Sequence, residues 1–289
     1  MANILVTGST GGLGRQTLDF LLERVPAAQL AALARDPAKL ADLAARGVDV
    51  RQGDYLDRAS LEAALQGIDR LFFISAPSFT DMVAQHRNIV SAATAASVPH
   101  IVYTGIQRRD GSGVIMDQVT ATEAATEDLL AASGAEITIL RNGTYMDALP
   151  FLLGPNALTE IRLPAGHGAA AFAARRDLGE ASAVVLTSEG HAGKTYTLSG
   201  GVAVSMDDIA AMLSPIAGRP VRYTDVPVAT FIAERTAAGL PKPVGIFLAS
   251  WMQAIAAGEF AEVSGDLERL IGRPTVTPAE MLPSLFAAG

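Results

Sequence analysis

Ile4-Leu5-Val6-Thr7-Gly8-Ser9-Thr10-Gly11-Gly12-Leu13-Gly14 opens the informative part of the chain, and an amphipathic stretch of helical period follows it. A short apolar strand thus runs into a turn whose glycines at 8, 11 and 14 are three residues apart. Such glycines permit a tight bend, close approach of a pyrophosphate to the backbone, and close packing of helix on strand. Free amides at the helix start then face the phosphates. The stretch predicts a nucleotide-binding unit.

The rest of the first half alternates short runs rich in valine, isoleucine and leucine with longer stretches of helical period. Near-continuous apolar strands separated by helices predict a parallel sheet covered on both faces. With right-handed crossovers this gives an α/β fold, a Rossmann-type doubly wound parallel sheet. The expected strands are residues 4–7, 29–34, 48–52, 70–74, 100–104 and 136–140. The expected helices are residues 13–23, 37–46, 58–66, 82–96 and 118–133.

The strict alternation stops at about residue 147. We therefore expect an NADP-binding domain over residues 1–146 and a smaller α/β substrate-binding lobe over 147–289, with the chain free to cross between them. Helices are expected at 177–188, 206–216 and around 244–257, and a strand at 195–199. Asp36 before Pro37 predicts a capped helix start. Gly47 and Gly134 predict left-handed helix ends.

The composition excludes several classes of protein. The 289 residues are 49% hydrophobic and 18% charged, which argues against a disordered chain. A net charge of −8 argues against nucleic acid as a partner. Zero cysteines exclude disulfides and thiolate chemistry, and the four histidines lack ligand spacing, so no metal is expected. We recognise neither a signal peptide nor a membrane span and expect a cytoplasmic protein with no membrane partner.

Arg35 indicates which dinucleotide the turn takes. NAD-preferring folds place an acidic residue about 20 positions after the glycines, where it accepts from the ribose hydroxyls. Here the second expected strand ends at Arg35, and Asp36, the acid beside it, is expected to cap the next helix. An arginine facing the ribose binds a 2′-phosphate. The sequence predicts NADPH as cofactor, the alternative being a plain surface arginine.

The chain lacks a familiar catalytic pair. Many short-chain dehydrogenases move a proton with a tyrosine and a lysine four residues later. The residues four positions after the five tyrosines are Ala59, Gln107, Leu149, Gly200 and Pro227. Alcohol–ketone interconversion by this route is therefore not expected.

Further motifs carry a resemblance to a known family. With the opening stretch, the chain resembles the NmrA-like atypical short-chain dehydrogenases over nearly its whole length. Within them it is similar to the branch of bacterial NADPH-dependent quinone oxidoreductases and triphenylmethane dye reductases. The motifs are Ala34-Arg35-Asp36-Pro37-Ala38-Lys39, Gly53-Asp54-Tyr55, Gln85-His86-Arg87-Asn88, Leu140-Arg141-Asn142-Gly143-Thr144-Tyr145, Gly190-His191-Ala192-Gly193-Lys194-Thr195-Tyr196 and Leu270-Ile271-Gly272.

The resemblance implies which residues contact the cofactor. All of them are expected outside the carboxyl ends of parallel strands, where ligands of this fold class bind. The implied contacts are Gly8, Thr10, Gly11, Gly12, Leu13 and Gly14 at the pyrophosphate, Arg35 at the 2′-phosphate, Asp54 and Tyr55 at the adenine, Ser75, Ala76, Pro77 and Gln85 at the ribose, and Thr104 and Asn142 at the nicotinamide.

Two positions depart from the branch. Gly12 stands where the branch often has glutamine or asparagine, so one side-chain contact is missing. Glu123 replaces a histidine, and in a dry pocket its pKa would rise enough for it to donate a proton. Most charged helix residues are solvated, so the sequence favours a solvated Glu123 and an exposed His86. Asn142 and Tyr145 complete the catalytic candidates.

The resemblance and the missing pair together predict an NADPH-dependent reductase that transfers hydride to an apolar aromatic electrophile, such as a quinone or a triarylmethane dye. Hydride alone then gives a stable product, and the proton comes from water. Alternatives are a non-catalytic NADP-sensing regulatory protein and a biosynthetic ketone or enone reductase. The oligomeric state stays open, with a homodimer as one option. Candidates for an apolar wall, or equally for the core, are Phe79, Ile106, Tyr145, Met146, Phe151 and Trp251.

Overall fold

A computed structural model describes residues 3–75, 81–109, 111–116 and 119–287 of the chain. The chain divides into two compact units. The first comprises residues 1–106, 121–141 and 175–196, and the second comprises residues 107–120, 142–174 and 197–289. The division is thus not a single cut near residue 146, because residues 175–196 return to the first unit and bring a helix and the start of a strand with them.

The first unit is built on a seven-stranded sheet of order β3-β2-β1-β4-β5-β6-β9. The pairs β1–β2, β2–β3, β1–β4 and β4–β5 are parallel. The order runs outward from β1 in both directions, so the predicted doubly wound sheet is confirmed. The strands are β1 Ile4–Val6, β2 Leu30–Ala34, β3 Asp49–Gln52, β4 Arg70–Ile74, β5 His100–Ile106, β6 Glu136–Asn142 and β9 Thr195–Leu198.

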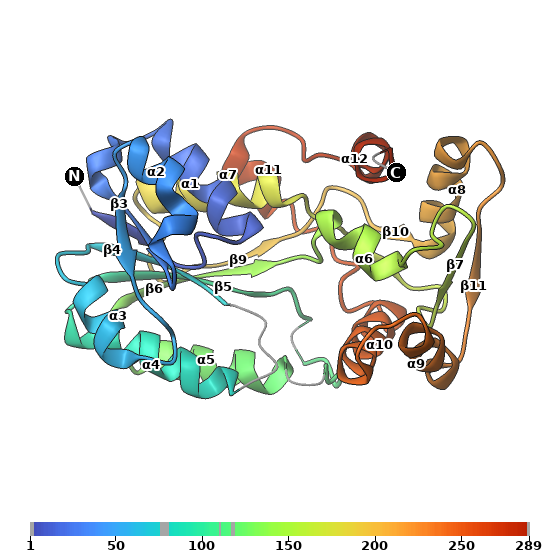
Figure 1. The fold of residues 1–289 in the computed structure, drawn as a ribbon, viewed down its shortest axis with the longest axis horizontal. Helices are drawn as coiled ribbons and strands as arrows, with labels where there is room; N and C mark the ends of the chain where they lie inside the picture. Colours follow the sequence, from blue (N-terminus) through green and yellow to red (C-terminus); the bar gives the residue numbers. More distant parts are fainter. Residues whose placement is uncertain (1–2, 76–80, 110, 117–118, 288–289) are drawn as a thin grey trace. The chain divides into compact units, whose positions relative to one another are not determined.

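Helices cover both faces of this sheet (Figure 1). Leu5, Phe73 and Tyr103 belong to the buried cluster that packs the strands against α3, α4 and α5, while α1, α2 and α7 lie on the opposite face. Because both faces are buried, the strands read as continuous apolar runs. The helices are α1 Gly12–Leu22, α2 Ala41–Ala45, α3 Arg58–Ala64, α4 Met82–Ala95, α5 Thr120–Ala131 and α7 Arg175–Thr187, with short 3-10 turns at Ala27–Gln29 and Pro37–Leu40.

The predicted helix boundaries are confirmed where local chemistry sets them. The Asp36 side chain accepts a hydrogen bond from the Ala38 amide at 3.1 Å, which begins the 3-10 turn. Gly47 and Gly134 have φ values of +90° and +79°, the left-handed conformation that ends a helix without steric cost. The Asp36 carboxylate is therefore engaged as a cap.

The second unit contains small sheets and several helices. β7 and β11 pair in parallel, and β8 pairs antiparallel with β10. Only α8 and α10 among these elements were predicted, because the short strands and helices here do not alternate regularly along the chain as those of the first unit do. The elements are η3 Met146–Ala148, α6 Leu149–Leu153, β7 Glu160–Leu163, β8 Ala169–Ala170, β10 Val204–Ser205, α8 Met206–Ala217, β11 Arg222–Asp225, α9 Val228–Ala237, α10 Lys242–Ala256, α11 Asp266–Ile271 and α12 Pro278–Phe286.

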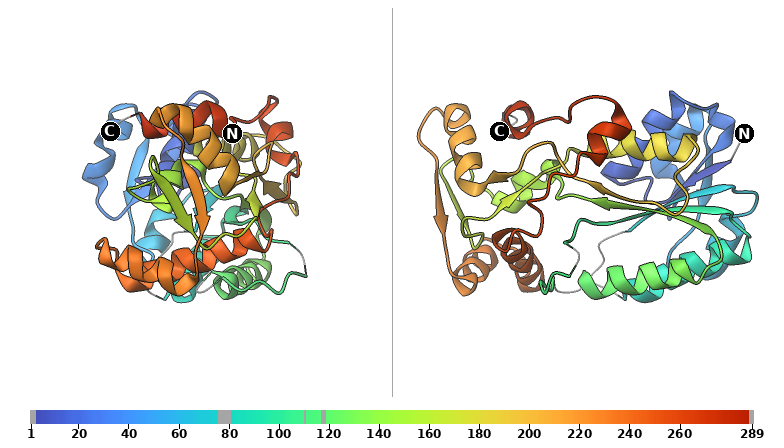
Figure 2. Two further views of the ribbon diagram at one scale, coloured as in Figure 1. Left: turned by 90° about the vertical axis from the view of Figure 1, so that its right-hand side faces the viewer. Right: turned by 180° about the vertical axis from the view of Figure 1, so that it is seen from behind.

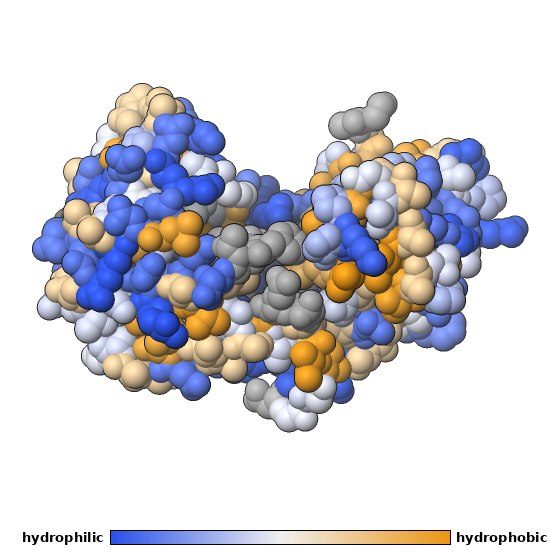
Figure 3. All heavy atoms as spheres, turned by 60° about the horizontal axis from the view of Figure 1, so that its bottom comes forward, coloured by the Kyte–Doolittle hydropathy of each residue, from blue (hydrophilic) through white to orange (hydrophobic). Residues whose placement is uncertain are grey.

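The surface mixes polar and apolar side chains, as the face in Figure 3 shows. Large apolar side chains that are exposed come from different elements and loops, as is common on protein surfaces. Within the described part of the chain, no helix has the length and apolar character needed to cross a membrane. The exposed apolar residues are Leu56, Ile115, Phe151, Val202, Ile246 and Val263.

Candidate functional site

The glycine turn after β1 has the geometry of a phosphate cradle. Gly8 has a φ of +59°, a conformation that a residue with a side chain rarely adopts, and its carbonyl accepts the Gly11 amide at 2.9 Å. The Ser9 hydroxyl donates to the Val6 carbonyl at 2.7 Å, which folds the turn back on its strand. Gly8, Thr10, Gly11 and Gly12 are all exposed, so the turn is open to a ligand.

The same turn begins α1 directly. A Cβ on Gly14 would lie 2.4 Å from the Gly8 carbonyl oxygen, so only glycine permits this approach. Gly11 caps the helix, and no side chain of the described residues accepts its first amides. No acidic residue lies in the first turn of α1. The exposed amides and the positive end of the helix dipole therefore fit a pyrophosphate.

Buried threonines fix the neighbouring strand ends relative to this turn. The Thr7 hydroxyl donates to the Phe72 carbonyl at 3.1 Å and accepts the Ile74 amide at 2.9 Å. The Thr104 hydroxyl accepts the Ser75 amide at 3.1 Å. The carboxyl ends of β1, β4 and β5 are thereby held at one edge. The predicted contacts Ala76 and Pro77, and the predicted wall residue Phe79, lie outside the described residues.

Other predicted cofactor residues have mixed environments. Arg35 follows β2, is exposed, and forms no ion pair with a described residue. Asp54 accepts the amide of Leu56 at 3.0 Å. The Tyr55 hydroxyl donates to the Ile74 carbonyl at 3.0 Å, so it supports the end of β4. Gln85 is buried on α4.

Glu123 corrects one expectation of the sequence analysis. It is not a solvated helix residue, because only 4% of it is exposed. The Tyr103 hydroxyl donates to its Oε1 at 3.2 Å, and its Oε2 lies 2.7 Å from where a Cβ on Gly105 would be. Glycine at 105 therefore makes room for the carboxyl group beside the carboxyl end of β5. The burial follows from α5 packing on the sheet, which the weakly amphipathic helix sequence does not reveal.

His86 corrects a second expectation, since it is fully buried rather than exposed. Its Nδ1 lies 2.7 Å from the Thr126 hydroxyl, which itself donates to the Thr122 carbonyl at 2.7 Å. The Thr126 proton is thus committed, so Nδ1 must carry the proton and donate. Nε2 is buried and has no hydrogen-bond partner among the described residues. Burial lowers the pKa of His86 to about 4, so the ring is neutral at pH 7.

The second unit holds the remaining catalytic candidates. The Asn142 amide nitrogen donates to the Tyr145 hydroxyl at 3.3 Å. The Asn142 Oδ1 is buried and has no hydrogen-bond partner among the described residues, so it is available as an acceptor. Trp251 stacks on Phe260 with ring centroids 5.3 Å apart, and its indole nitrogen donates to Thr144 at 3.2 Å.

The proposed apolar wall separates into core and surface residues. Met146 is fully buried and Ile106 is 8% exposed, so both belong to the packed interior. Phe151 is 55% exposed, and Tyr145 and Trp251 are half-buried. These three rings therefore remain as surface for an apolar ligand, whereas the first two support structure.

Glu259 is a residue that sequence reasoning missed. It is 2% exposed, and its carboxylate accepts the Arg109 amide at 2.7 Å and the Ser112 hydroxyl at 2.6 Å. These bonds hold the segment after β5 to the end of α10 within the second unit. No local sequence signal distinguishes Glu259 from the exposed Glu262 three residues later.

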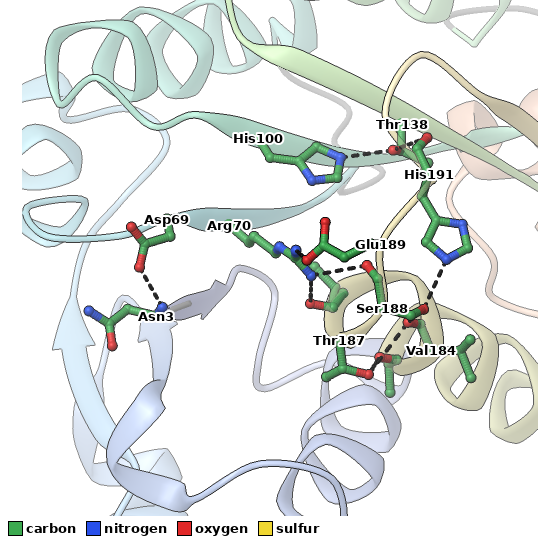
Figure 4. A network of polar contacts seen from close by, with 12 residues as sticks. Asn3, Asp69, Arg70, His100, Thr138, Val184, Thr187, Ser188, Glu189 and His191 are labelled. Carbon is green, nitrogen blue, oxygen red and sulfur yellow. Dashed lines mark hydrogen bonds and ion pairs between the residues drawn. The ribbon is translucent and has the colours of Figure 1, made fainter. Parts of the chain in front are cut away.

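A pocket of about 380 Å³ lies at the opposite edge, by the amino ends of β4, β5 and β6. Figure 4 shows the network of polar contacts around Arg70, His100 and His191 at this edge. Arg70 donates to the carbonyl groups of Leu186 and Ser188 at 2.7 and 3.2 Å and pairs with Glu189 at 2.5 Å, so it caps the carboxyl end of α7. His100 contacts the Thr138 hydroxyl at 2.8 Å. This network ties the α7–β9 turn to the sheet, and none of the predicted site residues lies in it.

The sequence of residues 1–273 matches the model of the NmrA-like family. The chain belongs to the NmrA-like family. Quinone oxidoreductase 2 of Escherichia coli is 39% identical over 287 residues, which cover 98% of each chain.

Solved structures agree with this assignment to the NmrA-like family. The NADPH-dependent quinone oxidoreductase of E. coli, complexed with NADPH, superposes with a TM-score of 0.91 at 38% identity, covering 98% of this chain and 99% of that one. The Citrobacter triphenylmethane reductase, complexed with NADP(H), gives a TM-score of 0.89 at 34% identity, covering 97% and 99%. The predicted family and fold are confirmed by these relatives.

Proposed function

We propose that this NmrA-like chain is an NADPH-dependent oxidoreductase that reduces an apolar aromatic electrophile, of the quinone or triarylmethane dye class. The observation that carries the proposal is the glycine cradle, in which Gly8, Gly11 and Gly14 shape a tight turn and the first amides of α1 have no side-chain cap. The quinone and triphenylmethane reductases described above, with which the chain shares its fold and more than a third of its residues, support the substrate class.

Different residues of the chain would bind different parts of the cofactor. The amides at the start of α1 would hold the pyrophosphate, and the exposed guanidinium of Arg35 would hold the 2′-phosphate. The hydrogen bond from the Ser75 amide to the Thr104 hydroxyl joins the ends of β4 and β5, where the nicotinamide ring would bind. When bound, NADPH would supply the hydride, and positioning of the reactants can contribute about 7–11 kcal/mol to lowering a barrier.

The source of the proton separates two candidate activities. A quinone or a cationic dye forms a stable product on hydride addition and can take its proton from water. A ketone or enone needs a donor, and the burial of Glu123 against Tyr103 favours this second candidate as an additional activity. A carboxyl group held in a dry site by a tyrosine hydroxyl is suited to proton transfer.

An activity screen tests the proposal. The purified chain is mixed with NADPH and, in separate assays, with a naphthoquinone, a cationic triarylmethane dye and an enone, and NADPH consumption is followed by absorbance. Multiple turnovers with the quinone or the dye are expected. NADPH binding without turnover of any acceptor would instead support the NADP-sensing alternative.

We also propose a cytoplasmic location and a small-molecule partner rather than a nucleic acid. The net charge of −8 supports the latter, since phosphate-tracking proteins present basic surfaces. Whether the chain forms a homodimer is tested by light scattering of the purified protein.

A further inference from the structure

Arg175, the first residue of α7, lies over the glycine turn. A Cβ built on Gly12 would be 3.1 Å from the Arg175 Cδ and 3.5 Å from both its Nε and Nη1. The side chain of Arg175 therefore occupies the space beside position 12 that a larger residue there would need. Gly12 is exposed and Arg175 is half-buried, so the guanidinium lies beside an exposed part of the turn.

The packing of α7 on α1 fixes this placement. A Cβ on Gly179 would lie 2.8 Å from the Gln16 Cβ and 3.0 Å from the Thr17 amide nitrogen, so the two helices touch backbone to backbone. The contacts Gly12–Arg175 and Gln16–Gly179 advance by four residues on both helices. The helices therefore run in the same direction and begin at the same edge, and they lie side by side in Figures 1 and 2.

The charges around the turn favour an anion. The first turn of α1 contains no acidic residue. Arg15, one turn further on, is paired with Asp42. In α7 the acidic residue of the first turn, Asp177, is fully buried, a position that stabilises the start of its own helix. Arg175 places a guanidinium beside Gly12, at the start of α1 where the first amides have no side-chain cap.

We propose that Arg175 binds the cofactor pyrophosphate and supplies the polar contact that glycine at position 12 cannot make. The inference rests on the proposed function and adds a residue to its site. A guanidinium presents paired N–H donors that match phosphate oxygens. Gly12 and Arg175 act as a unit, because a Cβ at position 12 would press on the Arg175 Cδ and shift the side chain that carries the guanidinium.

Calorimetric titration with NADPH and with NADH tests the proposal. Arg175→Met keeps the apolar stem over Gly12 and removes the charge. Both dinucleotides carry the pyrophosphate, so both dissociation constants should rise about 10- to 100-fold, the range expected for a lost charge-assisted hydrogen bond. The NADPH-to-NADH ratio should stay unchanged. The matched control, Arg176→Met, alters the adjacent exposed arginine and should leave both constants unchanged.

A double-mutant cycle tests the coupling of the two positions. Gly12→Ala should weaken the binding of both dinucleotides in the wild-type background. Combined with Arg175→Ala, it should cause no further loss of affinity. Affinity of the wild type should also fall more steeply with salt than affinity of Arg175→Met, a readout that a purely structural role would not change. Circular dichroism without cofactor verifies that each variant is folded.

Failure of the Arg175 inference and failure of the proposed function give different results. Wild-type affinity for both dinucleotides in Arg175→Met would overturn the inference, and the proposed function would stand. If the unaltered chain bound neither dinucleotide, the proposed function would fall together with the inference.

Discussion

Arg35 and Glu123 both have ionisable side chains near the edge where the parallel strands end, but their surroundings differ. Arg35 is exposed, whereas Glu123 is 4% exposed and accepts the Tyr103 hydroxyl. An exposed cation suits recognition of a mobile phosphate, and a buried carboxyl suits proton transfer. Each residue therefore leads to a prediction about a different step.

Arg35→Ala should weaken the binding of NADPH about 10- to 100-fold and the binding of NADH little, because one charge-assisted contact to the 2′-phosphate is lost. The measurement is calorimetric titration with each dinucleotide. Lys39→Ala, which removes an exposed cation from the following 3-10 turn, serves as the control and should leave selectivity unchanged. Equal losses for NADPH and NADH would refute the assignment of Arg35.

Glu123→Gln should lower turnover of an enone by about a hundredfold or more and remove one limb of its pH profile, if the carboxyl group donates the proton. The amide oxygen of glutamine can still accept the Tyr103 hydroxyl, so folding and NADPH affinity should be kept. Asp128→Asn, at an exposed position on the same helix, is the control. Unchanged kinetics would leave Glu123 with a structural role alone.

Among the elements, the strand–turn–helix formed by β1 and α1 depends on close backbone contacts. Gly14 lies against the Gly8 carbonyl group and Gly179 of α7 lies against Gln16, so α1 is enclosed on two sides without intervening side chains. Such contacts leave no room for relaxation, because a methyl group would meet backbone rather than a flexible side chain. The turn, α1 and α7 are therefore closely packed on one another.

Gly14→Ala should lower the free energy of unfolding by about 1–3 kcal/mol, since its Cβ would meet Gly8 backbone atoms. Gly14→Ala should also weaken the binding of NADPH and of NADH to the same extent, because the start of α1 must shift. Denaturant unfolding and titration measure the two effects. Gly113→Ala is the matched control, as its Cβ would meet nothing within 4 Å. Wild-type stability and affinity in Gly14→Ala would contradict the close contact.

At the scale of the whole molecule, stability should depend on pH through a residue that the site does not use. His86 is fully buried, its ring packs edge-on against Phe73 at a centroid distance of 5.0 Å, and its pKa is lowered to about 4. The unfolded chain protonates this histidine near its ordinary pKa of 6.5. The folded chain keeps it neutral until about pH 4, so acid favours unfolding.

The contribution of neutral His86 to the free energy of unfolding is fully present above pH 6.5 and is lost as the pH falls from 6.5 to about 4. At about 1.4 kcal/mol for each pKa unit, the loss reaches about 3 kcal/mol. Denaturant unfolding measured across this pH range should show the loss of unfolding free energy. In His86→Asn, which keeps a donor toward Thr126, the free energy of unfolding should depend less on pH. The control is His167→Asn, which alters a side chain that is 98% exposed and should leave the pH dependence of the unfolding free energy unchanged.

The sequence determined the parallel sheet, the glycine turn and the capped helix ends, because each follows from contacts between near neighbours in the chain. Apolar strands of three to seven residues and glycines at fixed spacing are visible without any tertiary information. Gly47 and Gly134 ended their helices as predicted for the same reason. The second unit was largely missed, since its short strands carry no such local pattern.

Burial and cross-chain contacts were decided only by the tertiary structure. Helix periodicity gave no reason to bury Glu123 or His86, because the facing residues, Tyr103 and Phe73, come from other strands. Arg175 reaches Gly12 from a helix more than 150 residues later in the chain, and only the packing of α7 on α1 brings them together. Local spacing sets the elements, whereas the partner of each side chain depends on which elements pack side by side.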